Sequence, residues 1–144
     1  MIVYCAAPIK GDQKFHNYCL DIIKQVSSLG HTALSELNDE FKPAILLTDT
    51  EIFSRDTKWI DKSRIVIAEV SGASLGVGFE IAYSLYKKKI PVLALINSEA
   101  KDVSAMITGC HAELLKIEKY SDTEDLKKVI TNFIKNSTPP NNHK

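Results

Sequence analysis

The chain has 144 residues, a length that one globular domain with a full hydrophobic core accounts for. Hydrophobic residues make up 44% and charged residues 25%, as is typical of globular proteins. The 18 Lys and Arg residues balance 18 Asp and Glu residues, so the overall charge favours neither nucleic acid nor an anionic membrane as a partner. No apolar run approaches the roughly 20 residues of a membrane span, and the apolar N-terminus is too short for a secretory signal.

The cysteines indicate a reducing compartment. Cys5, Cys19 and Cys110 are odd in number and contain no CxxC pair, which argues against a disulfide framework and against a zinc site. Cys19 falls on a helical apolar stripe and is expected to be a buried thiol. The four histidines lack metal-ligand spacing. We therefore expect a cytoplasmic protein with no metal and no cofactor.

The first half of the chain alternates between strand and helix patterns. Pro43 makes a continuous helix through residues 39–50 unfavourable, and Thr48 or Asp49 can cap the helix that follows. The predicted elements are a buried strand at 2–7, a helix carrying Phe15, Cys19, Ile22 and Val26 that ends at Gly30, a weaker strand at 31–37, and a helix at 50–63.

The second half continues the alternation. Its final helix carries Leu126, Val129, Ile130 and Phe133, with Ser121 or Asp122 as cap. The other predicted elements are a strand at 64–70, a helix with the apolar stripe Val77, Ile81 and Leu85, a strand at 90–97, a short helix at 103–107, and a weaker strand at 112–120.

This alternation predicts a single doubly wound α/β domain of the Rossmann or flavodoxin-like type over residues 1–136. Its central parallel sheet has about five strands covered on both faces, because the strands are apolar on both sides. Residues 137–144 are expected to be a disordered tail. In such sheets ligands bind beyond the carboxyl ends of the strands, which places the loops after residues 6 and 70 at the site.

The glycine-rich turn "SGASLGVG" at residues 71–78 suits an anion. It offers backbone N–H groups and Ser74 at a helix N-terminus, where a phosphate binds favourably. The turn lacks the GK[ST] ending of a P-loop and the third glycine of a dinucleotide fingerprint. Gly76 and Gly78 could equally serve only a tight turn and close packing.

Glu80 stands in the first turn of that helix, off its apolar stripe. We expect the helix dipole to keep it ionised and to lower its pKa. An ionised carboxylate beside a sugar phosphate is what a nucleophile at an anomeric carbon requires, although a first-turn glutamate can also simply cap the helix.

Such chemistry needs a second carboxyl group as the acid. Asp56 lies on the apolar face of the preceding helix, where burial would raise its pKa. Alternatively, Asp56 pairs with Arg55, Lys58 or Lys62 at the rim of the core. Glu69 is a further candidate acid or ribose contact, and Asp49 and Asp61 rank lower.

Four segments carry a family resemblance: "IVYCAAPIKG" at the start, "FSRDTKWIDKSRIVIAEV", "SLGVGFE" and "VSAMITG". From about residue 2 to about residue 110, the chain resembles the 2′-deoxynucleoside 5′-monophosphate N-glycosidases of the nucleoside 2-deoxyribosyltransferase superfamily. The resemblance implies hydrolysis of the N-glycosidic bond to free base and 2-deoxyribose 5-phosphate.

The resemblance also implies residue roles. Glu80 would be the covalent nucleophile, Asp56 the acid that assists departure of the base, and Tyr4 the residue beneath the sugar. The 5′-phosphate would be held by Ile9, Lys10, Gly11, Ser74 and Gly76, and, from the neighbouring subunit of a homodimer, by Ser104 and Met106.

The chain departs from the family pattern in the first loop and near the base. Ala7 and Pro8 replace a glycine and a serine, and Lys10 replaces an arginine, which keeps the charge but loses the bidentate fork. Near the base, Leu37 is the expected match to a residue that is often polar in the family.

Three other functions stay open. A ribonucleotide N-glycosidase would share the glycine-rich turn and the glutamate, and a deoxyribosyltransferase would leave the 5′-hydroxyl without a phosphate. A nucleotide-binding module without turnover is the third.

Overall fold

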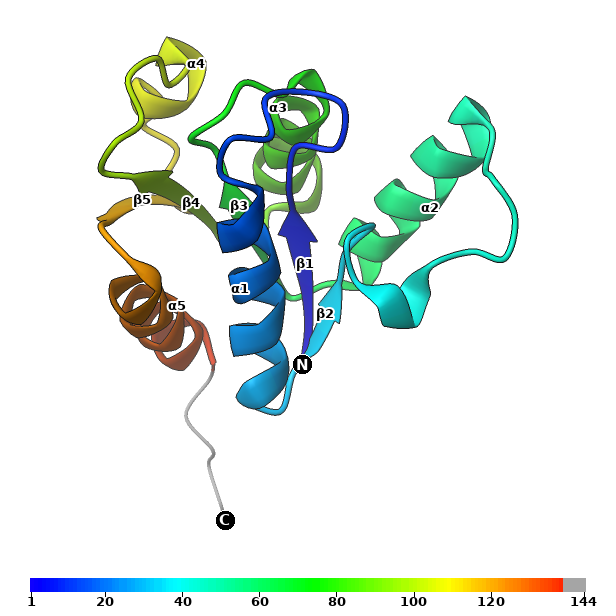
Figure 1. Cartoon of the computed structure of the whole chain (residues 1–144), viewed down its shortest axis with the longest axis horizontal. Coiled ribbons are helices and arrows are strands. Elements are labelled where there is room, and N and C mark those ends of the chain that lie inside the picture. Colours follow the sequence, from blue (N-terminus) through cyan, green and yellow to red (C-terminus); the bar gives the residue numbers. More distant parts are fainter. Residues whose placement is uncertain (139–144) are drawn as a thin grey trace.

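The computed structural model describes residues 1–138, which form one α/β domain around a five-stranded sheet (Figure 1). All neighbouring strands pair in parallel, in the order β2-β1-β3-β4-β5. The strands are β1 (Ile2–Ala6), β2 (Thr32–Leu34), β3 (Ile65–Glu69), β4 (Val92–Asn97) and β5 (Leu115–Tyr120). The predicted fold class is confirmed.

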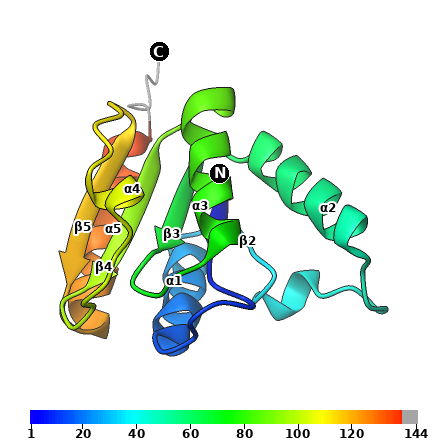
Figure 2. The same ribbon diagram turned by 90° about the horizontal axis from the view of Figure 1, so that it is seen from above.

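Helices cover both faces of the sheet. Helices α1 and α5 pack side by side on one face, and α2 and α3 cover the other (Figures 1 and 2). The helices are α1 (His16–Ser28), α2 (Asp49–Lys62), α3 (Leu75–Ala82), α4 (Ala105–Thr108) and α5 (Thr123–Ser137), with the short helical turns η1 (Asp39–Phe41) and η2 (Tyr83–Lys88). None of these helices is long and apolar enough to cross a bilayer, a statement that covers residues 1–138.

The strand sequences divide between two hydrophobic cores because successive side chains of a strand point to opposite faces. In β1, Val3 and Cys5 join the core beneath α1 and α5, whereas Tyr4 and Ala6 join the core beneath α2 and α3. The expected buried thiol of Cys19 lies in α1 and is 3% exposed. The alternation directs Tyr4 towards the face that carries α3, and therefore towards Glu80.

Local sequence explains where the site-bearing helices begin. Thr48 caps α2 in a full capping box, since its hydroxyl accepts from the Glu51 amide and the Glu51 carboxylate accepts from the Thr48 amide. Ser74 caps α3 by accepting from the Val77 amide at 3.3 Å. A π-helical turn, η2, extends α3 as far as Lys88.

The structure differs from the sequence prediction in two places and resolves one ambiguous segment. The strand expected at 31–37 is shorter, because β2 ends at Leu34 and the chain then turns. The ambiguous residues 39–50 form η1, an irregular segment and the start of α2, and no continuous helix, as expected from Pro43. Helix α5 runs to Ser137, and residues 139–144 of the expected tail lie outside the described residues.

The strand order places a switch point between β1 and β3, since the chain leaves these neighbours in opposite directions across the sheet. The loops that follow the two strands meet there. The Asp12 amide donates to the Ala73 carbonyl at 3.1 Å, which ties the β1–α1 loop to the glycine-rich turn. A Cβ atom at Gly11 would overlap this same carbonyl oxygen.

We predict that Gly11→Ala destabilises the protein by about 1–3 kcal/mol, because the Ala73 carbonyl is held by a hydrogen bond and cannot move aside freely. Gly76→Ala is the matched control, since its Cβ would meet its nearest neighbours only at 3.8 and 3.9 Å. Urea denaturation measures the free energy of unfolding of both variants. Equal stability of the two variants would contradict the tight loop contact.

Candidate active site

A cavity of about 960 Å³ lies at the switch point, between the β1–α1 loop, α2 and the start of α3. Seven of the ten residues predicted from the sequence to form the site line it together: Ile9, Lys10, Gly11, Asp56, Ser74, Gly76 and Glu80. This volume is at the upper end of the range usual for small-molecule sites.

Glu80 is the carboxyl group most withdrawn from water in this cavity. Its Oε2 atom is buried and has no hydrogen-bond partner among the described residues. Burial raises the pKa of Glu80 to about 8. The expectation that the helix dipole would lower this pKa is therefore wrong, because desolvation of the carboxylate outweighs the dipole.

Tyr4 approaches Glu80 from β1 but, unlike the seven residues above, does not line the cavity. Its ring is buried, at 3% exposure, and its hydroxyl interacts favourably with the Glu80 carboxylate, an effect that acts to lower the pKa of Glu80. Burial, followed by the charge of Glu80, raises the pKa of Tyr4 well above its usual value. Tyr4 thus remains a neutral hydrogen-bond donor beside Glu80.

Asp56 faces the cavity as part of a charged cluster with Arg55 and Glu36. The Arg55 Nε donates to Asp56 Oδ1 at 2.9 Å, and the other end of the guanidinium pairs with Glu36. Arg55 also stacks over Trp59, 4.7 Å from the ring centroid. Burial raises the pKa of Asp56, as expected, although the pairing with Arg55 opposes this rise. Asp56 is therefore both partly buried and paired with Arg55, as the two interpretations from the sequence each proposed in part.

The other end of the cavity is suited to an anion. The N-terminus of α3, with Ser74 and Gly76, lies beside the loop that carries Lys10 and Gly11. Within residues 1–138, Lys10 forms no ion pair. Its ammonium group and the free amides of the helix N-terminus provide positive charge for a phosphate.

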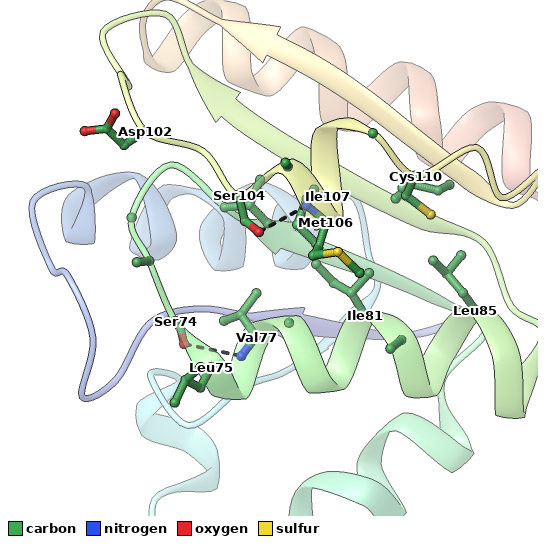
Figure 3. A pocket seen from close by; sticks show the side chains of 18 of the residues that line it. Ser74, Leu75, Val77, Ile81, Leu85, Asp102, Ser104, Met106, Ile107 and Cys110 are labelled. Carbon is green, nitrogen blue, oxygen red and sulfur yellow. Dashed lines mark hydrogen bonds between the residues drawn. The ribbon is translucent and has the colours of Figure 1, made fainter.

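Ser104 and Met106 lie elsewhere. They line a second cavity of about 750 Å³ on the opposite side of α3, between Ile81 and Leu85 and the segment that holds α4 (Figure 3). Ser104 caps α4 by accepting from the Met106 amide at 3.2 Å, and Met106 is 83% exposed. Within one chain, the structure does not bring these two residues to Glu80.

The three lower-ranked candidates lie in different environments. Glu69 is buried at 1% exposure, accepts from the Ser71 amide and the Tyr120 hydroxyl at the start of the glycine-rich turn, and lines neither cavity. Asp61 pairs with Lys88 and Tyr83 outside the cavity, whereas Asp49 lines its rim.

Two charged residues that line the cavity, Glu36 and Lys42, were missed from the sequence, and Leu37 was misplaced. Leu37 packs against the core beneath α1 and α5, and Glu36 lines the cavity in its place. Glu36 could have been found from its position just beyond a strand at the carboxyl edge of the sheet. The apolar residues 43–47, which were given no role from the sequence, form the outer side of the cavity.

The family model for nucleoside 2-deoxyribosyltransferases matches residues 3–127. The chain belongs to the nucleoside 2-deoxyribosyltransferase family. This finding confirms the resemblance that the sequence motifs indicated.

Two curated relatives of the chain have informative names. The chain is 36% identical over 128 residues to "Putative 2′-deoxynucleoside 5′-phosphate N-hydrolase 1" of Thermofilum pendens, covering 87% of this chain and 89% of the relative. It is 26% identical over 141 residues to the 5-hydroxymethyl-dUMP N-hydrolase of Esox lucius, covering 94% and 97% of the two chains.

Solved structures support the fold. A CMP N-glycosidase from Clostridium botulinum superposes with a TM-score of 0.67 at 14% identity, covering 91% of this chain and 98% of that one. A 2-deoxyribosyltransferase from Bacillus psychrosaccharolyticus superposes with a TM-score of 0.64 at 19% identity, covering 87% and 89%. These neighbours share the architecture of the nucleoside 2-deoxyribosyltransferase family.

The raised pKa of Glu80 predicts how stability depends on pH. Its pKa in the folded state, about 8, lies above its usual value of 4.5, so between these values the folded protein holds a proton that the unfolded chain releases. The free energy of unfolding therefore falls as pH rises through this window. Glu80→Gln lacks this loss, and we predict that its stability advantage over the wild type grows from pH 4.5 to 8 by roughly 2–4 kcal/mol.

Denaturant unfolding at several pH values measures this advantage, with Glu113→Gln, at an exposed position, as the control. An advantage for Glu80→Gln that stays constant with pH would show that Glu80 is not desolvated.

Proposed function

We propose that this protein hydrolyses the N-glycosidic bond of 2′-deoxynucleoside 5′-monophosphates, releasing the free base and 2-deoxyribose 5-phosphate. The observation that carries the proposal is the buried carboxyl of Glu80 beside Tyr4 and Asp56, in a cavity whose far end is a helix N-terminus. The names of the relatives in the family support the same reaction and substrate class.

In the first step, the Glu80 carboxylate attacks C1′ of the deoxyribose while the bond to the base breaks. Asp56 gives its proton to the departing base, so that the base leaves neutral. The result is an ester between Glu80 and C1′. In the second step, Asp56 takes a proton from water, the water attacks C1′, and Glu80 is released as a carboxylate.

The first step requires that Glu80 is ionised and that Asp56 holds the proton. In the free protein, burial holds the proton on Glu80 with a pKa of about 8, whereas Arg55 favours ionised Asp56. Before the first step, the proton must therefore move from Glu80 to Asp56. Positive charge that develops on the sugar beside Glu80 favours its ionisation, and the proton then serves the base through Asp56.

The phosphate end distinguishes the hydrolase from a transferase. Lys10, Gly11, Ser74 and Gly76 would bind the 5′-phosphate, with Ile9 packed against the sugar. The cavity beside this loop is lined by the apolar Ala7. Binding of the phosphate therefore depends on backbone amides and on the single ammonium group of Lys10. Tyr4 lies behind Glu80 and does not itself line the cavity, so the choice of deoxyribose over ribose rests on the family resemblance.

The family resemblance further suggests a homodimer whose sites are shared. Three exposed apolar side chains line the second cavity, namely Leu75, Tyr86 and Met106, at 97%, 67% and 83% exposure. A second copy packed on this surface would cover them and bring its Ser104 to the phosphate end of the first cavity, since Ser74 lines both cavities. The three free cysteines support a reducing compartment, the cytoplasm.

Base release tests the proposed reaction. We predict that the protein frees bases from deoxynucleoside monophosphates, and that Glu80→Gln lowers kcat by at least about 1,000-fold because the nucleophile is lost. Chromatography of free base measures both. Release from ribonucleoside monophosphates alone would favour a ribonucleotide N-glycosidase, and nucleotide binding without release from any substrate would overturn the enzyme.

Subunit complementation tests the shared site. Glu80→Gln and Ser104→Glu should each be inactive alone, the latter because a carboxylate repels the phosphate. Randomly mixed subunits of the two variants should recover about one quarter of wild-type activity, since half of the dimers carry one intact site out of two. No recovery after verified subunit exchange would contradict a site built from two subunits.

A further inference from the structure

Most of the exposed apolar side chains of this protein surround a single cavity. Within residues 1–138, nine large hydrophobic side chains are exposed, and six of them line the cavity that contains Glu80. Isolated exposed apolar residues are ordinary, but such a concentration marks a binding surface. These six side chains are Ile9, Ile45, Leu46, Phe53, Leu75 and Phe79.

Four of the six form a continuous feature with the segment before α2. We call residues 43–47 together with Phe53 and Phe79 the apolar wall. Ile45 is 73% exposed and Leu46 is 97% exposed. The rings of Phe53 and Phe79 lie 5.8 Å apart between centroids, which links α2 to α3 across the cavity mouth. In Figure 2 the segment before α2 stands away from the sheet, at the outer end of the molecule.

The apolar wall lies where the base of a nucleotide would extend. The phosphate end of the cavity is formed by the β1–α1 loop and the N-terminus of α3, and Glu80 marks the position of C1′. Asp56, which would protonate the base, comes from α2, the helix that also carries Phe53. A base that leaves towards Asp56 therefore meets the apolar wall.

The charged side chains on this side of the cavity are mostly paired, with Asp49 at the rim as the exception. The guanidinium of Arg55 is held by Asp56 and Glu36, and Lys42, at the start of the segment, pairs with Asp39 at 2.5 Å. The side chains of residues 43–47 are those of Pro, Ala, Ile, Leu and Leu, which neither donate nor accept hydrogen bonds. A hydroxyl group buried against them would lose its water without gaining a side-chain partner.

We propose that the apolar wall selects deoxynucleoside monophosphates whose bases carry apolar substituents and discriminates against hydroxylated ones. This inference rests on the proposed function and specifies its substrate class. It sets this chain apart from its relative in Esox lucius, which is named for a hydroxymethylated substrate. The exposed side chains of the wall would be covered by the substituent in the bound state.

The test compares near-isosteric substrate pairs. One pair is 5-ethyl-dUMP and 5-hydroxymethyl-dUMP, and a second is dAMP carrying a propyl or a 2-hydroxyethyl group on N6. We expect kcat/KM for the apolar member to exceed that of the hydroxylated member at least about tenfold in one of the two series, depending on how the base is oriented. Equal or higher kcat/KM for the hydroxylated member in both series would overturn the proposal and would indicate that backbone groups of the wall read the substituent.

Variants locate the preference. Ile45→Thr combined with Leu46→Asn should reduce the ratio within the discriminating pair to about threefold or less, because the hydroxylated substituent then gains side-chain partners. Both side chains are largely exposed, so the fold should tolerate the change. Leu114→Ser is the matched control, because Leu114 is 36% exposed and lines neither cavity.

Three outcomes separate the hypotheses. Base release from no deoxynucleotide would defeat the proposed function itself, whereas release with equal rates on both members of each pair would defeat only the proposed selectivity. An unchanged ratio in the double variant, together with a smaller assembly by light scattering, would identify the wall as a subunit contact and overturn its assignment to the base.

Discussion

The burial of one carboxyl group, with an oxygen that no described residue hydrogen-bonds, governs the chemistry of this protein. Glu80 is the sixth residue of α3 and not in its first turn as predicted, so the helix dipole acts on it weakly and desolvation raises its pKa to about 8. Such an arrangement costs stability in the folded state. It persists because α3 is fixed by the Val77 and Ile81 side chains in the core beneath it and by the Ser74 cap.

The neighbours of Glu80 have opposite effects on its ionisation. Tyr4 and Arg55 each favour the ionised form, whereas Asp56 and Glu36 oppose it. Because these side chains come from β1, α2 and the segment after β2, the charge state of Glu80 depends on the whole switch point of the sheet. A ligand that places positive charge near the carboxyl would release the proton that burial retains.

Much of the fold could be predicted from the sequence because its signals are local. The β-branched strands, the Thr48 cap and the stripe of Val77 and Ile81 each depend on residues a few positions apart. The order of the strands depends on pairing between distant segments, which local patterns do not specify. The loops at the carboxyl edge of the sheet could still be predicted, since parallel strands present ligands there. Seven of the residues named for the site accordingly share one cavity.

The remaining features depend on contacts that sequence spacing does not reveal. The predicted direction of the pKa shift of Glu80 was wrong because the residues around it come from β1 and α2, which are distant in the sequence. The sequence analysis placed Leu37 at the site, where the structure has Glu36. The strand ends three residues earlier than predicted, and this changes which side chain faces the site. Residues 43–47 have no periodic pattern, and only the fold shows that they border the cavity.

The stereochemistry of the product decides whether Glu80 forms a covalent bond to the sugar. The measurement is NMR of the methyl 2-deoxyriboside 5-phosphate formed when the wild-type protein acts on a β-deoxynucleotide in water containing methanol. Two successive displacements at C1′ retain the configuration, so we predict the β-methyl product. The α-methyl product would contradict a covalent Glu80 intermediate and would show that solvent displaces the base directly, with Glu80 acting only as a base.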